Sequence, residues 1–257
     1  MKILCIGDVV SRSGRECLKE HLERIVTEKD ISLTVINGEN LSHGRGISRS
    51  TYDEMLELGV NGFTLGNHTW NCKDAVTLLS YQDNIIRPAN FSKSNPGRGS
   101  MILKTKSGEK VGFINISGRT YMEPVSCPFE AADREIARLK SETDIIFVDF
   151  HAEATSEKIA LGWYLDGKVT AVFGTHTHVQ TSDEVILPKG TGYITDLGMT
   201  GAFYSVLGME RRPVIRKFMT GMPQKFEVAE GKARFCGCIF DVDKAGKCLD
   251  VERINIM

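Results

Sequence analysis

Residues that can bind a metal follow several short apolar runs of this 257-residue sequence. They are Asp8, Glu39, Asn40, Asn67, His68, His151, His176 and His178. The set combines two carboxylates and amide oxygens with four of the six histidines. Such a mixture suits Mn, Fe or Zn better than Ca, which prefers oxygen ligands alone. Any one of these histidines alone is more often a surface or core residue, so the indication comes from the whole set.

The candidate ligands outnumber what one tetrahedral ion needs. They match two adjacent ions about 3.5–4 Å apart that share a carboxylate, an arrangement that clamps the attacking and leaving oxygens in phosphate ester cleavage. Glu39 is the natural bridge between two such ions. A structural zinc site would more typically use cysteines, and the seven cysteines of the chain include no CxxC pair. The residues therefore predict a dinuclear centre for phosphate ester chemistry.

The elements that carry these residues must end at one place. Strands are expected near residues 2–7, 32–37, 62–65, 110–116, 144–150 and 169–173. Helical segments alternate with these strands, as in an α/β fold with helices on both faces of a central sheet. The carboxyl ends of parallel strands emerge at one edge of a sheet. Residues as far apart as Asp8 and His178 are therefore expected to converge.

Two helices are expected in the first part of the chain. The apolar face of the first is formed by Leu18, Leu22, Ile25 and Val26. Ser13, with Glu16 three residues later, predicts a capping box at its start. The second helix is expected to begin near Ser48 or Ser50 and to carry Met55–Leu56 inward.

The last third of the chain has a different pattern. Three β-like pieces, Phe226–Ala229, Arg234–Val242 and Leu249–Ile256, are separated by the turns Glu230-Gly231 and Ala245-Gly246. They predict antiparallel hairpins that complete a second sheet. The expected architecture is a two-sheet β-sandwich flanked by helices. Because no repeat or linker-like run interrupts the chain, a single domain is expected over residues 1–257.

Composition limits the classes of partner. Lys+Arg number 32 and Asp+Glu number 33, so the net charge is −1. This balance argues against an extended nucleic-acid surface or a polybasic membrane-binding surface, but it permits a local basic pocket. Hydrophobic residues make up 41% of the chain. A chain of this length buries roughly 70% of its extended surface on folding, so its core needs no disulfides.

The cysteines and the N-terminus indicate a cytoplasmic protein. Seven cysteines are an odd number, and several lie within apolar runs, as reduced and buried thiols do. The chain begins with the strand-like run Lys2–Ile6, which lacks the features of a signal peptide. No apolar stretch approaches the roughly 20 residues of a membrane-spanning helix. Dehydrogenase, P-loop and serine-hydrolase functions are disfavoured because the GxGxxG, Walker A and GxSxG motifs are missing.

Five motifs occur in a fixed order along the chain. They are Gly7-Asp8, Asn37-Gly-Glu-Asn40, Gly66-Asn-His68, His151 after an apolar strand, and Gly174-Thr-His-Thr-His178. With them the chain resembles the calcineurin-type metallophosphoesterases, and more closely their bacterial YmdB-like branch of cyclic-nucleotide phosphodiesterases. Two later segments, Tyr193–Gly201 and Ser205–Gly208, also resemble that branch, so the resemblance covers nearly the whole chain. It implies the calcineurin-like fold, a four-layer αββα sandwich.

The chain departs from the broad superfamily at two ligand positions. The usual Asp-x-His opening is Asp8-Val9-Val10, and a glutamate, Glu39, replaces the usual bridging aspartate. The YmdB-like branch is similar in both respects, and Asn40 can take the place of the missing histidine. The resemblance implies Asp8, Glu39, Asn40 and His178 around one ion, and Glu39, Asn67, His151 and His176 around the other. Two divalent transition-metal ions are thus expected, Fe or Mn first and Zn as a further option.

A mechanism follows from two such ions. They could lower the pKa of a shared water, so that the resulting hydroxide attacks phosphorus in line with the leaving sugar oxygen. His68 lies beside Asn67 without being committed to a metal, which makes it the candidate general acid. The resemblance implies 2′,3′-cyclic nucleotides as substrates, with 3′,5′-cyclic nucleotides as an extension. A phosphomonoesterase or nucleotidase, and a metal- and nucleotide-binding regulatory protein, stay open as alternatives, as does assembly into a homo-oligomer.

Several other residues invite two interpretations. His43 and Arg45 could approach the substrate, but a glycine-rich surface turn is favoured. For Trp70 a packing role is favoured over base stacking, and for Arg211-Arg212 a solvated helix face is favoured over phosphate or RNA binding. By resemblance Thr120, Asp196, Met199 and Thr200 could shape the pocket, and ordinary loop packing explains them equally well.

Overall fold

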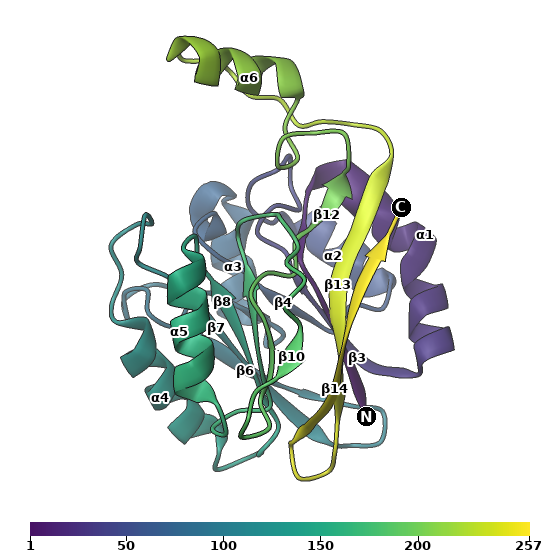
Figure 1. The fold of residues 1–257 in the computed structure, drawn as a ribbon, viewed down its shortest axis with the longest axis vertical. Coiled ribbons are helices and arrows are strands. Elements are labelled where there is room, and N and C mark those ends of the chain that lie inside the picture. The colour runs from purple at the N-terminus through teal and green to yellow at the C-terminus, as the bar shows by residue number, and fades with distance from the viewer.

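The computed structural model describes all residues from 1 to 257. Two β-sheets lie face to face, and helices cover the outer face of each (Figure 1). The structure confirms the α/β class and the four-layer sandwich. No helix combines the length and the apolar character that crossing a membrane requires.

The first sheet contains both ends of the chain. Its strands, in order, are β2 (Asp8–Val9), β12 (Met199–Ala202), β13 (Ala233–Val242), β1 (Lys2–Ile6), β3 (Ile31–Asn37), β4 (Gly62–Thr64) and β5 (Ile85–Ile86), and β14 (Cys248–Ile256) pairs with β13. β1, β3, β4 and β5 run parallel, with Cys5 opposite Val35 and Ile36 opposite Phe63. β13 lies antiparallel to β1.

The second sheet is built from the middle of the chain. Its strands, in order, are β10 (Val185–Ile186), β11 (Gly192–Ile194), β9 (Ala171–Thr175), β8 (Ile146–His151), β7 (Lys110–Ser117) and β6 (Ser100–Lys104). The four strands from β11 to β7 are parallel, and the two edge strands are antiparallel to their neighbours. The carboxyl ends of β8 and β9 therefore emerge together.

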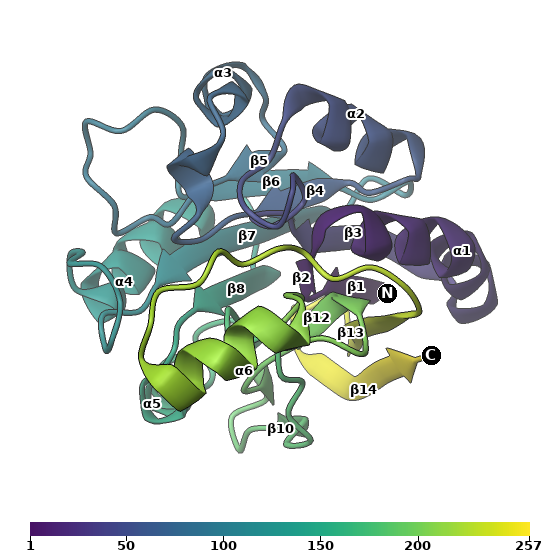
Figure 2. The same ribbon diagram turned by 90° about the horizontal axis from the view of Figure 1, so that it is seen from above.

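Helices complete the outer layers. The helical segments are α1 (Ser11–Lys29), α2 (Arg49–Glu57), the 3-10 helix η1 (Thr69–Asn71), α3 (Asp74–Tyr81), α4 (Pro128–Leu139), α5 (Thr155–Leu165) and α6 (Arg211–Thr220). α1 to α3 lie on the side of the first sheet, and α4 and α5 lie on that of the second (Figure 2). α6 stands outside the layers, beyond β12 (Figure 1), and exposes Arg211 and Arg212 as a solvated helix face.

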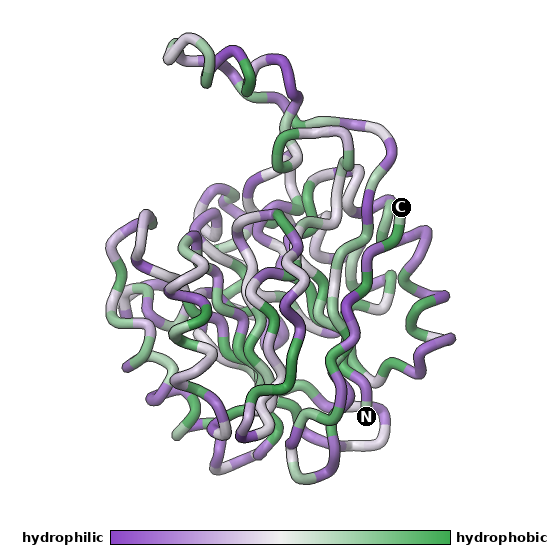
Figure 3. Tube along the Cα trace, viewed as in Figure 1, coloured by the Kyte–Doolittle hydropathy of each residue, from purple (hydrophilic) through white to green (hydrophobic).

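The strands divide their side chains between three cores, because successive residues of a strand point to opposite faces. Ile3 and Cys5 belong to the core between the two sheets, together with Phe147 of β8. Leu4 and Ile6, on the other face of β1, pack beneath the helices of the first sheet. A third core lies between the second sheet and α4 and α5. Hydrophobic segments accordingly follow the central strands, and hydrophilic ones gather on the periphery (Figure 3).

The C-terminal hairpin lies in a different sheet from the one expected. β13 and β14 form the predicted antiparallel hairpin, but β13 pairs with β1 and completes the first sheet. The prediction of a second sheet there was wrong, because hydrophobic pattern does not reveal which strand edge a distant hairpin will fill. Phe226–Ala229 is not a strand, and within it Val228 forms only an isolated bridge with Met209.

The start of α1 also differs from the prediction. The helix begins at Ser11, whose backbone N–H donates to Asn40 O at 2.9 Å. Ser13 is therefore inside the helix, where its hydroxyl donates to Ala229 O at 3.4 Å, and it forms no capping box with Glu16. A tertiary hydrogen bond, rather than a local cap, sets the beginning of this helix.

α2 follows the prediction at its start and departs from it in one side chain. Ser48 is the N-cap, and it forms a capping box with Thr51. Met55 and Tyr52 are buried, as an inward-facing pair three residues apart should be. Leu56 is 36% exposed, so the expectation that it points inward was wrong. One residue beyond Met55, the helix has turned by about 100°, which takes Leu56 off the buried face.

Candidate metal centre

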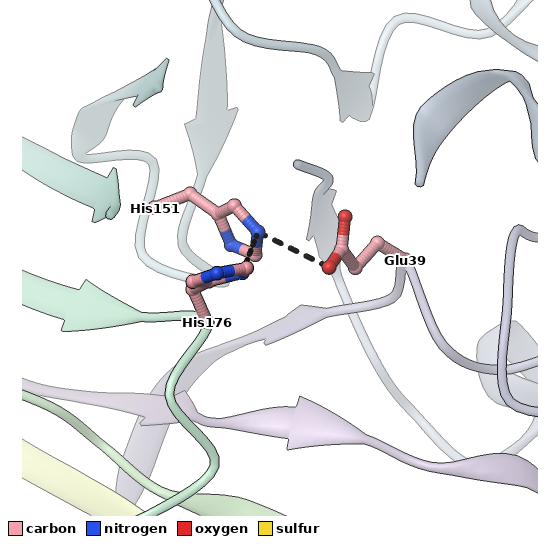
Figure 4. Close-up of side chains that lie close together, drawn as sticks. All are labelled: Glu39, His151 and His176. Atoms are coloured by element: carbon pink, nitrogen blue, oxygen red, sulfur yellow. Dashed lines mark hydrogen bonds and ion pairs between the residues drawn. The ribbon is translucent and has the colours of Figure 1, made fainter. Parts of the chain in front are cut away.

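The predicted ligands lie together at the edge of the sandwich where the parallel strands of both sheets have their carboxyl ends. Asp8 begins β2, two residues after the end of β1; Glu39 and Asn40 follow β3, Asn67 and His68 follow β4, His151 ends β8, and His176 and His178 follow β9. Figure 4 shows Glu39, which follows a strand of the first sheet, pointing toward His151 and His176 of the second. The centre therefore needs both sheets, because neither alone supplies all of these side chains.

Glu39, His151 and His176 form the middle of the cluster. His151 Nε2 lies 3.1 Å from Glu39 Oε1 and 3.1 Å from His176 Nδ1. One candidate ligand atom from each residue lies within 4.8 Å of those of the other two. Glu39 and His151 are buried, and His176 is half-buried. Two imidazole nitrogens and a carboxylate oxygen so arranged can coordinate one divalent cation.

Asp8, Asn40 and His178 are the residues expected to bind the second ion together with Glu39. Asp8 is fully buried; its Oδ1 lies 3.7 Å from His178 Nε2, and its Oδ2 accepts from the backbone N–H of His176 at 3.0 Å. Asp8 Oδ1 and Asn40 Oδ1 are buried and have no hydrogen-bond partner. Buried polar atoms are almost always paired. Two orphaned oxygens among imidazoles and carboxylates fit a cation, so the donor set is compatible with the implied metals.

Asn67 and His68 occupy the loop after β4. Asn67 Oδ1 lies 2.8 Å from His151 Nε2, which brings it into the central cluster. The backbone N–H of His68 donates to Glu39 Oε2 at 2.8 Å, while its ring Nδ1 lies 3.3 Å from Asn71 Oδ1. The Nδ1 atom of the His68 ring thus faces η1, and its assignment as an unligated histidine stays a prediction.

Burial and ion pairing set the charges of the centre. Burial by itself would raise the pKa of Glu39, but the charge and hydrogen bond of His151 outweigh it and lower that pKa. Burial by itself would lower the pKa of His151, but the charge and the hydrogen bond of Glu39 outweigh burial and raise that pKa. Burial raises the pKa of Asp8 and lowers the pKa of His176 to about 3. A metal would replace the proton of the central pair, since a ligating imidazole must be neutral.

Position 66 must be a glycine because the side chains of the cluster lie very close to its backbone. A Cβ at this position would lie 2.2 Å from His151 Nε2 and 2.5 Å from Glu39 Oε2. Both distances are far inside van der Waals contact, so any larger residue would displace the cluster. The glycine of the Gly66-Asn-His68 motif therefore allows the loop after β4 to approach the centre.

A buried chain of hydrogen bonds orients His151. Its Nδ1 lies 2.9 Å from Thr175 Oγ1, and that hydroxyl donates to Asp149 Oδ1 at 2.7 Å. The hydroxyl must then accept from Nδ1–H, which leaves Nε2 free for a metal. Burial raises the pKa of Asp149 to about 6. The sequence interpretation missed this support, although Asp149 and His151 are two positions apart in β8 and therefore lie on the same face of the strand.

A buried ion pair holds the loop of the last two histidines. Lys158 and Asp196 are each 1% exposed, and their charged atoms lie 2.5 Å apart. Lys158 Nζ donates to Thr175 O at 2.8 Å, and Asp196 Oδ2 accepts from the Thr177 hydroxyl at 2.7 Å. The interpretation of the sequence missed Lys158 and left Asp196 open between pocket and packing roles. The structure shows Asp196 as a support of this loop.

Glu153 is a second residue that the sequence interpretation missed. Its Oε2 lies 3.1 Å from His176 Nε2, while the Nδ1 atom of the same ring faces His151. A carboxylate on the far nitrogen of a metal-binding histidine fixes the tautomer and the orientation of the ring. The only available signal was its position two residues after His151.

The loop after Asn40 forms a turn. His43 and Arg45 are exposed, and His43 has a positive φ of 52°. Asn40 Nδ2 donates to Gly44 O at 3.0 Å, and Arg45 N donates to Ser42 O at 2.9 Å. These contacts agree with the favoured interpretation of this segment as a glycine-rich surface turn.

Comparison with known proteins identifies relatives over the full chain. The chain is 47% identical over 257 residues to a 2′,3′-cyclic-nucleotide 2′-phosphodiesterase of Bacillus subtilis (strain 168), covering 100% of this chain and 97% of that one. It is similar to the crystal structure of a protein from Thermus thermophilus, with a TM-score of 0.92 and 41% identity over 99% of this chain and 98% of that chain.

A second solved structure, of a phosphatase from Mycoplasma pneumoniae, has a TM-score of 0.93 and 38% identity over 100% of this chain and 93% of that chain. These similarities confirm the calcineurin-like fold that the sequence resemblance implied. The family model described as "YmdB-like protein" matches residues 4–254. The ordered motifs and the geometry of the strand ends agree with this match. The chain belongs to the YmdB-like protein family.

Proposed function

We propose that this protein is a metal-dependent phosphodiesterase that hydrolyses 2′,3′-cyclic nucleotides. The class of enzyme expected from the sequence, a phosphoric diester hydrolase, is confirmed by its relatives. The observation that carries the proposal is the convergence of carboxylate, amide and imidazole donors around Glu39, with two buried oxygens left unpaired. 3′,5′-Cyclic nucleotides are a second substrate class to be tested.

The ligand assignment uses Glu39 as the shared residue. One ion would be held by Asp8, Glu39, Asn40 and His178, and the other by Glu39, Asn67, His151 and His176. The contacts of Glu39 with His151 and of Asp8 with His178 support this division. Two divalent ions, Fe or Mn or else Zn, would supply Lewis acidity that offsets the charge of the phosphate oxygens and makes water a stronger nucleophile.

The side chains have separate tasks in this proposal. Asp149 and Thr175 keep the Nε2 atom of His151 available for ligation. His68 is the proposed general acid for the departing sugar oxygen, and Asn71 faces its Nδ1 at 3.3 Å. The proton that His68 transfers is therefore expected on Nε2. No side chain is required as a covalent nucleophile.

The function is tested with purified protein of measured metal content. Turnover of 2′,3′-cyclic and 3′,5′-cyclic nucleotides is compared with and without added Mn²⁺, beside terminal phosphate monoesters. Glu39→Gln should lose bound metal and diester turnover together, whereas Glu16→Gln, at an exposed carboxylate on α1, should keep both. Preference for monoesters would replace the proposal with a nucleotidase. Slow turnover unaffected by Glu39→Gln would instead favour a regulatory binding protein.

A further inference from the structure

A large cavity opens beside the metal centre. Its volume is about 820 Å³, within the range of small-molecule sites. Asn67 lines it, and the Oδ1 atom of the same residue lies 2.8 Å from His151 Nε2. We call it the side cavity, and its other lining residues include Trp70, Phe91, Asn95, Glu123 and Ser126. One residue is thus shared by the cavity and the cluster where phosphate would bind.

The walls of the side cavity are fixed by buried polar side chains. Arg87 is 5% exposed, and its guanidinium donates to the backbone carbonyls of residues 95–97, each at 3.2 Å. Asn90 is 2% exposed and donates to Ser117 O at 2.7 Å and to Ser126 O at 3.0 Å. These bonds tie the loop after β5 to the loop after β7. The cavity is therefore formed before any ligand arrives, which reduces the ordering cost of binding.

Trp70 has an open ring surface at this cavity. It is 39% exposed, and its ring centroid lies 6.4 Å from that of Phe91 at an interplanar angle of 39°. Phe91 supports the tryptophan from one side, and a separation of 6.4 Å is too small for another ring to enter between them. A planar ligand would thus stack on the free surface of Trp70. Of the two roles considered from sequence, the contact with Phe91 is packing, and the exposed surface of the ring leaves room for base stacking as well.

The charges of the cavity favour a neutral group. Lys93 and Glu123 are both exposed and have opposite signs. The third charged residue, Arg134, is already engaged, since its guanidinium donates to Ala89 O at 3.0 Å and lies 3.3 Å from a carboxylate oxygen of Glu135. The remaining polar groups of the lining are amides and hydroxyls. A second phosphate would find no cluster of free cations, whereas a nucleobase needs an aromatic surface and neutral hydrogen-bonding groups.

We propose that the side cavity binds the nucleobase of the substrate, and that Trp70 is the residue on which the base stacks. This inference rests on the proposed function, because it places the phosphate of the same nucleotide at the metal centre. Asn67 then lies between the base-binding cavity and the metal centre, because it contacts both. Trp70 determines affinity for the nucleoside part of the substrate, whereas the chemistry takes place at the metal ligands.

The test compares a 2′,3′-cyclic nucleotide with glycerol 1,2-cyclic phosphate, a cyclic phosphodiester without a base. Trp70→Ala should lower kcat/KM for the nucleotide about tenfold relative to kcat/KM for the glycerol ester, mainly through KM, as loss of one base–aromatic stack implies. Trp70→Phe should restore most of that ratio. Trp163→Ala, which removes an exposed tryptophan of α5, is the control and should leave the ratio unchanged. An unchanged ratio in a folded, metal-loaded Trp70→Ala protein overturns the inference.

A binding measurement separates this inference from the proposed function. The chain has two tryptophans, so Trp163→Phe leaves Trp70 as the single tryptophan fluorophore. Adenosine 3′-monophosphate should quench its fluorescence, and inorganic phosphate should not. If the wild-type protein hydrolyses no phosphodiester but quenching persists, the function fails and the base site stands. If hydrolysis of cyclic nucleotides is normal and quenching is missing, the base site fails and the function stands.

Discussion

The ammonium group of Lys158 lies 2.5 Å from Asp196 Oδ2 in the interior of the protein, and the same ammonium donates to Thr175 O at 2.8 Å. Asp196 in turn accepts from the Thr177 N–H at 3.2 Å. The segment between these contacts carries His176, whose φ is 96°, an uncommon backbone conformation for a residue with a side chain. The ion pair thus holds a strained loop of candidate ligands in place.

Removing one partner of this pair should destabilise the fold. Lys158→Met leaves the Asp196 carboxylate buried without its cation, so the free energy of unfolding should fall by about 3–5 kcal/mol. Urea unfolding monitored by circular dichroism measures the change. The double variant Lys158→Met/Asp196→Asn removes both charges and should recover a large part of the loss. Equal stabilities of the single variant and the wild type would contradict a structural role for the pair.

The positions of the candidate ligands could be predicted from sequence because they depend on local pattern. Buried parallel strands appear as continuous apolar runs, and a polar residue at the end of such a run must lie at the carboxyl edge of its sheet. Asp8, Glu39 and His151 follow this rule. Their roles as metal ligands stay a prediction, as does the single-domain organisation over residues 1–257.

The supports of the site could not be predicted in the same way. Lys158 lies on a helix, and only the packed structure shows that its ammonium reaches across to β9 and Asp196. The place of the C-terminal hairpin was also missed, because the partner of β13 is β1, at the opposite end of the chain. Alternation fixes which residues of a strand face the core, but it does not fix which edge the strand joins.

The cysteines should differ sharply in reactivity. Burial raises the pKa of Cys17, Cys236 and Cys248 to about 12, and only the thiolate reacts quickly. Since folding raises these values, the thiols stay protonated at pH 8 in the native protein and ionise more readily after unfolding. Cys5 and Cys238 are buried as well, whereas Cys72 and Cys127 are partly exposed.

Titration with a coloured disulfide reagent at pH 8 tests this difference. Two thiols should react rapidly in the native protein, and the other five should react after denaturation. Cys72→Ser should reduce the rapid phase from two thiols to one. Rapid reaction of more than two thiols would show that the segments carrying the five buried cysteines open far more readily than their burial implies.

Glu153 should affect metal affinity without being a ligand itself. Its carboxylate lies 3.1 Å from His176 Nε2, and removing such a partner typically weakens metal binding about 10–100-fold. Glu153→Gln should therefore raise the Kd for Mn²⁺ by that factor, as measured by titration calorimetry. Glu142→Gln, at an exposed ion pair with Lys110, is the matched control. The same Kd in both variants would remove Glu153 from this role.

His68 should contribute to turnover rather than to metal binding. Its ring Nδ1 lies 3.3 Å from Asn71 Oδ1, and His68 is not among the expected metal ligands, so His68→Ala should keep the metal content of the wild type. Loss of a general acid typically costs about 10²–10⁴-fold in rate. Turnover of a 2′,3′-cyclic nucleotide, whose leaving group is a basic alkoxide, should fall within that range.

The leaving group provides the control for this assignment. A p-nitrophenyl phosphodiester releases a weakly basic phenolate that needs little protonation, so His68→Ala should slow its hydrolysis much less. His21→Gln, on α1, should change neither rate. If His68→Ala slows both substrates equally while retaining its metal, then His68 positions the substrate or the loop after β4, and the departing sugar oxygen must take its proton from another group or from water.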